Sequence, residues 1–243
     1  MKILVIGESC KDVFNYGRCT RLCPEAPVPV FNPVRTVENP GMAMNVQRNI
    51  QALGADANIH TNSNWQNITK TRFIDLRSNH MFMRLDQGDE SYGRSKLKLI
   101  KFSKYDSVVI SDYNKGFLSE DDIEYVTSKH DVVFLDTKKR LGAWCEKARF
   151  IKINEEEYRR TKDSLSEEMI KKLIVTLGPK GCRYNEVLYP VSEVEVKDTS
   201  GAGDTFVSAL SVKYTETGDI EKSIEFANQC ASVVVQKRGV GTT

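Results

Sequence analysis

The sequence predicts an α/β fold with a doubly wound, mainly parallel sheet that carries helices on both faces. Short apolar runs typical of buried strands alternate with segments of helical spacing along much of the chain. Polar residues follow several of these strands, at the edge where open α/β sheets bind their ligands. The 243 residues are enough for a substantial core, and we expect a single domain over residues 1–243.

The first part of the chain is predicted to consist mainly of strands. We expect strands at 3–6, 31–38 and 57–61, a hairpin over 69–76 and 81–85, and helices at 41–53 and 92–102. Prolines at positions 24, 27 and 29 exclude a helix there and favour an extended segment. The polar stretch 62–67 is expected to be a loop.

The second part alternates strands with helices. We expect strands at 107–111, 132–135, 150–153 and 173–177, followed by short strands within 187–196. Ser119 is expected to cap a helix that ends at Ser128, and Asp219 to cap the last helix. Another helix follows the small residues near position 203. This order indicates right-handed strand–helix–strand units and hence a parallel sheet.

Composition excludes several classes of function. The chain has 35 basic and 33 acidic residues, a net charge of +2, and no basic stripe, so nucleic acid is not favoured as a partner. No apolar run approaches a membrane span, and the first residues lack a signal-peptide pattern, so we expect a cytoplasmic protein without a membrane partner. Six cysteines without a Cys-x-x-Cys pair, and three histidines, make zinc improbable and reduced thiols the expectation.

The stretch DTSGAGDTF, residues 198–206, is the strongest chemical signal in the chain. Its small residues precede a segment of helical spacing, and a helix N-terminus with free N–H groups favours an anion. The adjacent Asp204 would serve as a base, so the pair suits phosphoryl transfer to a hydroxyl. The alternative is an ordinary helix cap in a tight turn. The phosphate-binding loop of nucleotide hydrolases does not fit, because no Gly-Lys-Ser/Thr ending follows.

This stretch resembles the C-terminal signature of the ribokinase-like (PfkB) carbohydrate kinases. PEAPVPV at 24–30 and RLD at 84–86 are similar to the heptose 7-phosphate kinase branch of that family. The resemblance implies an enzyme that uses ATP as co-substrate and Mg²⁺. It assigns the catalytic base to Asp204 and the anion hole to Gly201, Ala202 and Gly203.

The resemblance also implies a set of sugar-binding residues: Asp12, Gly41, Asn45, Arg84 and Lys138. A carboxylate such as Asp12 accepts two hydroxyl hydrogens, and an arginine such as Arg84 can bind a phosphate bidentately. The alternatives are a loop aspartate, a plain polar helix residue at Asn45 and a surface arginine. Two positions depart from the family pattern: Glu8 replaces an aspartate and Met42 replaces a glycine.

On the nucleotide side, Asn154 and Glu157 match the family's Asn-x-x-Glu, which organises magnesium, here through water. The same pattern is also a helix capping box, and both interpretations stay open. The remaining nucleotide-binding residues implied by the resemblance are Thr176, Gly178, Gly181, Asn228 and Gly239.

In the family, strands here expected within about 13–39 and 69–86 form a lid over the sugar, and we expect a homodimer through it because a sheet edge is left unpaired. The chain is shortened near 62–67, on the substrate side. The expected function is conversion of heptose 7-phosphate to heptose 1,7-bisphosphate with ATP. The alternatives are a kinase for another sugar or sugar phosphate, and a non-catalytic sugar or nucleotide sensor derived from a kinase.

Overall fold

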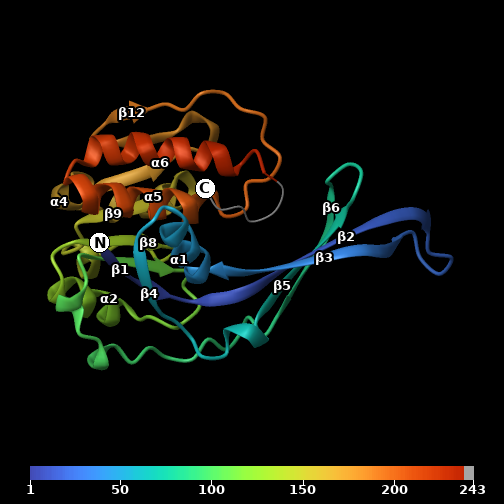
Figure 1. Cartoon of the computed structure of the whole chain (residues 1–243), viewed down its shortest axis with the longest axis horizontal. Coiled ribbons are helices and arrows are strands. Elements are labelled where there is room, and N and C mark those ends of the chain that lie inside the picture. Colours follow the sequence, from blue (N-terminus) through green and yellow to red (C-terminus); the bar gives the residue numbers. More distant parts are fainter. Residues whose placement is uncertain (238–243) are drawn as a thin grey trace.

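The computed structural model of the chain, which describes residues 1–237, contains two sheets (Figure 1). The main sheet consists of β1 (Lys2–Gly7), β4 (Asp56–His60), β7 (Ser107–Asp112), β8 (Val133–Thr137), β9 (Phe150–Asn154), β10 (Leu173–Thr176), β11 (Cys182–Tyr184) and β12 (Val187–Tyr189). Its strand order is β12-β11-β10-β9-β8-β7-β1-β4. The six strands from β10 to β4 run parallel, and only β11 and β12 are antiparallel. The predicted doubly wound, mainly parallel sheet is confirmed.

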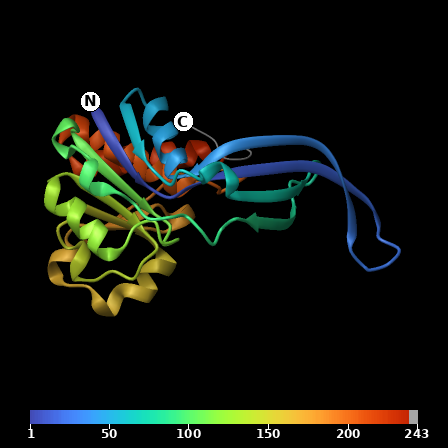
Figure 2. The ribbon, with the colours of Figure 1, turned by 90° about the horizontal axis from the view of Figure 1, so that it is seen from below.

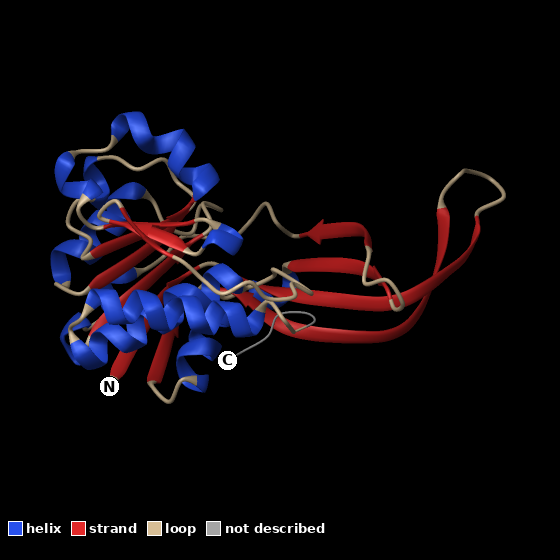
Figure 3. Ribbon diagram, turned by 90° about the horizontal axis from the view of Figure 1, so that it is seen from above, coloured by secondary structure: helices blue, strands red, loops and turns tan. Residues whose placement is uncertain are grey.

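Helices cover both faces of the main sheet because its strands are apolar on both sides (Figures 2 and 3). Ile3 and Val5 of β1 pack in the cluster that holds α1 (Ala43–Ala52), α5 (Ala202–Thr217) and α6 (Ile220–Val234). Leu4 and Ile6 pack in the opposite cluster, with α2 (Glu120–Lys129) and α4 (Glu167–Ile170), and α3 (Glu155–Thr161) adds the half-buried Tyr158. The alternation along β1 therefore sends successive side chains to different helical layers.

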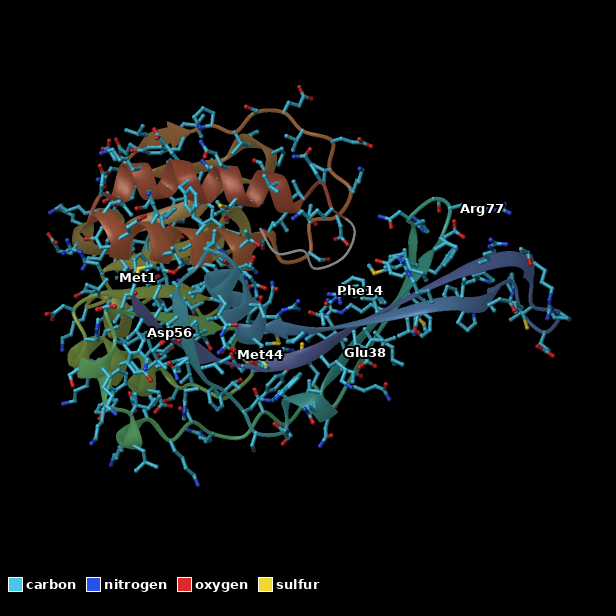
Figure 4. The ribbon with its side chains drawn as sticks, viewed as in Figure 1. Met1, Phe14, Glu38, Met44, Asp56 and Arg77 are labelled. Carbon is cyan, nitrogen blue, oxygen red and sulfur yellow. The ribbon has the colours of Figure 1, made fainter. Side chains whose placement is uncertain are left out.

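The second sheet has the order β3-β2-β5-β6 and contains the strands expected to form a lid, so we call it the lid below. It consists of β2 (Ser9–Leu22), β3 (Pro29–Met42), β5 (Thr69–Asp75) and β6 (Met81–Gln87). The β2–β3 ribbon extends far from the main sheet in Figure 1, and Figure 4 places Phe14 within it and Arg77 at the outer end of the β5–β6 hairpin. Phe14, Tyr16 and Ile74 form a small core of the lid's own.

Some predicted elements differ from the structure. Residues 92–102 were expected to be helical, but they contain only short 3₁₀ turns at Leu97–Leu99 and Phe102–Lys104. The buried residues there are five apart (Tyr92, Leu97 and Phe102), a spacing that no single helical face can hold. The segment must also connect the lid to the start of β7, and a helix rises only 1.5 Å per residue, so extended chain covers the distance.

Two predicted elements have different boundaries in the structure. The first helix begins at Ala43 and not at Gly41, because β3 continues to Met42, whose φ of 59° breaks the extended run. The region 187–196 forms a strand only at β12, since Pro190 follows it and proline cannot donate to a sheet ladder. The loop expected at 62–67 carries one short 3₁₀ turn, at Trp65–Asn67.

Within the described residues, none of the helices combines the length and the apolar character needed to cross a membrane. The six cysteines, all of which lie in this part of the chain, are free thiols.

Candidate active site

The residues 198–206 form the turn that starts α5, at the carboxyl end of the main sheet. Gly201 is the N-cap residue and has a φ of 82°, a left-handed conformation that explains a glycine there. The N–H of Ala202 donates to Thr199 O at 3.2 Å, so it is not free for a ligand. The N–H groups of Gly203 and Asp204 lie in the first turn of α5, where a helix offers no carbonyl partner. Of the three residues expected to form the anion hole, Gly203 therefore presents the best placed amide.

Asp204 is buried, and its side chain makes no capping hydrogen bond at the start of α5, where Gly201 is the N-cap residue. Its Oδ1 accepts a hydrogen bond from the Tyr113 hydroxyl at 2.7 Å, and its Oδ2 accepts one from Asn45 Nδ2 at 2.9 Å. Burial raises the pKa of Asp204 to about 6, against the lowering effect of these two bonds. A carboxyl of this pKa is ionised at neutral pH and remains basic enough to take a proton.

A buried lysine stands directly beside the helix N-terminus. Lys152 Nζ binds Asp136 Oδ2 at 2.9 Å, and a side chain added at Gly203 would come within 3.0 Å of Lys152 Nζ. Burial alone would lower the pKa of Lys152, but the carboxylates of Asp136 and Glu157 outweigh burial, and the pKa is raised. The lysine is therefore cationic where an anion would lie. It was not predicted from the sequence, although a lysine within an apolar strand was the available signal.

Asn154 and Glu157 form a complete capping box at the start of α3. Asn154 Oδ1 accepts from Glu157 N at 2.8 Å, and Glu157 Oε2 accepts from Asn154 N at 2.7 Å. The other oxygen, Oε1, accepts from Lys138 Nζ at 3.1 Å. Both Glu157 oxygens are thus occupied, and within residues 1–237 there is no group of three metal-ligating side chains. Asn154 and Glu157 therefore suit a magnesium ion that is bound by nucleotide phosphates and water, and not one that is surrounded by protein ligands.

Three cavities lie in a row along this edge of the sheet. The acceptor cavity, of about 310 Å³, and the central cavity, of about 410 Å³, share Tyr113, Lys138, Gly201 and Asp204. The central cavity and a largely apolar cavity of about 500 Å³ share Thr176, Gly178, Thr199 and Gly203. Larger hollows of about 720 and 880 Å³ lie at the amino ends of the strands and share no residue with this row. Open α/β sheets bind ligands at the carboxyl ends, so the row is the candidate site.

The apolar cavity contains most of the residues expected to bind nucleotide. Thr176, Gly178, Gly181 and Asn228 all line it. Gly181 has a φ of 89°, and a side chain there would collide with Tyr189 O. Asn228 Nδ2 already donates to Tyr189 O at 3.0 Å, so it also fixes the strand that borders the cavity. Gly239 lies outside the described residues.

The acceptor cavity is lined by side chains of both the lid and the main sheet: Asp12, Met42, Lys70, Arg72, Arg84, Asp86, Tyr113, Lys115, Lys138, Ser200, Gly201 and Asp204. Gly41 adjoins it indirectly, since a side chain at Gly41 would come within 2.2 Å of Asp12 Oδ2. Lys70, Arg72 and Lys115 were not predicted from the sequence. The signal for two of them was their spacing along β5, where register places Lys70 opposite Asp12 and Arg72 two residues on.

Four of the residues expected to bind sugar already have protein partners, among them Lys138, which donates to Glu157. Asn45 is buried and binds Asp204, so it contacts the base and is not among the residues lining the acceptor cavity. Arg84 is forked onto Asp86, with Nε–Oδ1 and Nη2–Oδ2 distances of 2.7 Å. Asp12 Oδ1 likewise accepts from Arg72 at 2.6 Å. The cavity therefore presents paired charges that a ligand would have to share or exchange.

Comparison with known proteins agrees with this geometry. Residues 42–243 match the sequence profile described as the pfkB family carbohydrate kinase. Two curated relatives, both named Bifunctional protein HldE, come from a Nitratiruptor species and from Hydrogenovibrio crunogenus; each is 31% identical and covers 99% of the chain. The chain spans 63% and 60% of their lengths. The matched stretches, of 293 and 290 residues, exceed the 243 residues of the chain, in agreement with its shortening.

Solved structures show the same fold at low identity. The ribokinase of Thermotoga maritima has a TM-score of 0.72 at 17% identity, with 98% of this chain and 94% of that one covered. The Arabidopsis thaliana ribokinase complexed with ribose and ATP has a TM-score of 0.70 at 16% identity, with 98% and 93% covered. The predicted ribokinase-like fold is therefore confirmed.

Proposed function

The chain belongs to the pfkB family of carbohydrate kinases, and from that premise we propose that it transfers the γ-phosphoryl group of ATP to a hydroxyl of a sugar phosphate. The observation that carries the proposal is the row of three cavities with Asp204 at the junction of the first two. In this arrangement the apolar cavity binds the adenine of ATP, the central cavity binds its phosphates, and the acceptor cavity binds the sugar.

The proposed step needs one proton acceptor and local positive charge. The acceptor oxygen forms a bond to the γ-phosphorus, the bond from phosphorus to the bridging oxygen breaks, and ADP leaves. Asp204 receives the hydroxyl proton, which its pKa of about 6 permits. The N-terminus of α5 and the ammonium of Lys152 lie where they would stabilise negative charge on the moving group.

The charge of the acceptor cavity supports a phosphorylated sugar. Five cationic side chains line it: Lys70, Arg72, Arg84, Lys115 and Lys138. Arg72 is sequestered by Asp12, whereas the Arg84, Lys115 and Lys138 side chains keep 41, 36 and 44% of their surface exposed. Each of the three is paired with a carboxylate, Arg84 with Asp86, Lys115 with Asp89 and Lys138 with Glu157, so a phosphate would have to share or exchange these partners. The resemblance to the heptose 7-phosphate kinase branch favours heptose 7-phosphate as acceptor, with heptose 1,7-bisphosphate as product.

Magnesium would enter with ATP. Bound between the nucleotide phosphates and water, it would neutralise charge on the phosphates, and Glu157 would act on it only through water. Because ATP is the co-substrate, we place the reaction in the cytoplasm.

We also propose that the enzyme is a homodimer paired through the lid. The lid face that points away from the acceptor cavity carries Met83 and Leu85, which are 53 and 41% exposed. All seven residues of the edge strand β6 are exposed. A partner lid would cover this face and edge.

Matched pairs of acceptors test the proposed function. ATP turnover is measured with heptose 7-phosphate and heptose, and with the phosphorylated and free forms of a hexose and a pentose. We expect the phosphorylated member of a pair to react faster, and Arg84→Ala to reduce that preference. Arg77→Ala, at the outer end of the β5–β6 hairpin (Figure 4), is the matched control. Equal rates for both members would contradict a sugar phosphate, and binding of sugar and ATP without turnover would support the sensor.

A further inference from the structure

Both oxygens of the base are occupied before any acceptor binds. Asn45, which holds Oδ2, is buried and does not line the acceptor cavity. Tyr113, which donates to Oδ1, lines both the acceptor and the central cavity. Oδ1 is therefore the oxygen on the cavity side, and the Tyr113 hydroxyl lies where an acceptor hydroxyl must approach.

Besides Asp204, two groups hold Tyr113 in place: the Glu8 carboxylate at its backbone and the Lys138 ammonium at its ring. Glu8 Oε2 accepts from Tyr113 N at 2.8 Å, and Glu8 Oε1 accepts from Lys115 N at 3.0 Å. The ammonium of Lys138 lies 5.1 Å from the centre of the Tyr113 ring. Burial and the nearby Asp204 raise the pKa of Tyr113 far above its usual value, so the hydroxyl remains a donor at any working pH.

We infer that Tyr113 is a positioning residue that keeps Asp204 engaged until an acceptor hydroxyl takes over the hydrogen bond, and thereby limits phosphoryl transfer to water. The inference rests on the proposed function, since it assigns Asp204 the role of base. It gives Tyr113, which directly follows β7, a task in coupling ATP use to the presence of sugar.

The reaction that Tyr113 would suppress is ATP hydrolysis. A water oxygen forms a bond to the γ-phosphorus, the bond to the bridging oxygen breaks and ADP leaves, while Asp204 takes the water proton. Removing the tyrosine hydroxyl leaves space beside Oδ1 for an exchanging water, which hydrogen-bonds the carboxylate less firmly than the fixed phenol and can lose its proton to it.

The test compares Tyr113→Phe with Tyr214→Phe. Tyr214 is on the same helix as Asp204, and its hydroxyl accepts from Arg149 Nε at 3.1 Å, away from the row of three cavities. We expect ATP hydrolysis without sugar to rise at least about tenfold in Tyr113→Phe, and to stay at the wild-type level in Tyr214→Phe. The ratio of sugar phosphorylated to ATP consumed should fall only in Tyr113→Phe.

A second measurement does not depend on turnover. Carbon-13 NMR of labelled aspartate carboxyls, with the Asp204 signal assigned from its loss in Asp204→Asn, gives the pKa of Asp204 directly. The tyrosine bond lowers that pKa, so it should rise in Tyr113→Phe and not in Tyr214→Phe. An unchanged pKa, or hydrolysis no faster than in Tyr214→Phe, overturns the inference even if sugar kinase activity is intact. If the wild type phosphorylates no acceptor, the proposed function fails, and hydrolysis gained in Tyr113→Phe still supports the tyrosine's role.

Discussion

In the proposed reaction Asp204 is the proton acceptor, and replacing it by asparagine is expected to separate binding from reaction. Asp204→Asn keeps the size of the side chain and an oxygen that can accept from Tyr113. Gly203 and Lys152 are unchanged, so ATP affinity measured by calorimetry should stay near wild type. Loss of the proton acceptor should reduce sugar phosphorylation at least about a hundredfold. A variant that turns over sugar at the wild-type rate would refute the assignment of the base.

The same residue determines the acid limb of the pH profile. Burial places the pKa of Asp204 at about 6, above its usual value, and the base works only when it is ionised. Turnover should therefore level off at higher pH and fall as pH drops through about 6, by about tenfold per unit below it. The measurement is kcat against pH at saturating ATP and sugar, with circular dichroism at each pH to exclude unfolding. A limb centred near pH 4 would contradict the environment of the carboxyl described above.

The sequence singled out Asp204 as a candidate base but did not predict which side chains surround it. The glycines around Asp204 predicted an anion site beside a base, because small residues at a helix start leave the backbone N–H groups accessible. Tyr113, Asn45 and Lys152 come from three other segments, and only the folded sheet brings them together. The hydrogen bond between Asn45 and Asp204 could not be predicted from the sequence, since the two residues are 159 positions apart in the chain.

At the scale of the elements, a substitution at the start of α3 distinguishes the two proposed roles of Glu157, helix capping and action on magnesium through water. Glu157→Gln retains the capping box, because glutamine also accepts from the N-cap amide, but weakens the contact with Lys138. We expect a stability loss of about 1 kcal/mol or less in chemical unfolding. If Glu157 also acts on magnesium through water, the magnesium concentration for half-maximal turnover should rise.

Glu156→Gln is the matched control for that experiment, since Glu156 is in the same turn and exposed. Coincident magnesium titrations for wild type and both variants would leave Glu157 with its capping role alone.

The elements that were predicted correctly are those in which pattern and environment coincide. The buried strands of the main sheet are apolar on both faces, and the capping box at Ser119 starts α2 as expected. The helix predicted at residues 92–102 was wrong. The side chains of Tyr92, Leu97 and Phe102 pack separately into the core on one side of the main sheet and do not form one face of a helix. The five-residue spacing of Tyr92, Leu97 and Phe102 was the signal in the sequence against a single helical face.

For the molecule as a whole, the lid gives a prediction about assembly. Met83→Lys with Leu85→Lys places two charges on the lid face that points away from the site, so a dimer paired there should dissociate. Light scattering at micromolar concentration should give a dimer for the wild type and a monomer for the double variant. Leu188→Lys, an equally exposed leucine on β12, should leave the mass unchanged. A wild-type monomer would contradict pairing through the lid.

The lid also joins the main sheet at two points that matter for the site. β1 is separated from β2 only by Glu8, and β3 runs directly into α1 at Met42. Ser9 pairs with Met42, and Ala43 N donates to Glu8 O at 2.9 Å, so the two joints are tied together. Glu8 holds the backbone of Tyr113, and α1 carries Asn45.

The end of the β2–β3 ribbon at the main sheet therefore lies next to both groups that hold Asp204. Glu8 bonds to the backbone of Tyr113, and the first turn of α1 carries Asn45. A rotation of the ribbon toward the acceptor cavity would move both groups, so closure over an acceptor and alignment of the carboxylate would be mechanically coupled through the joint at Met42, whose φ is 59°.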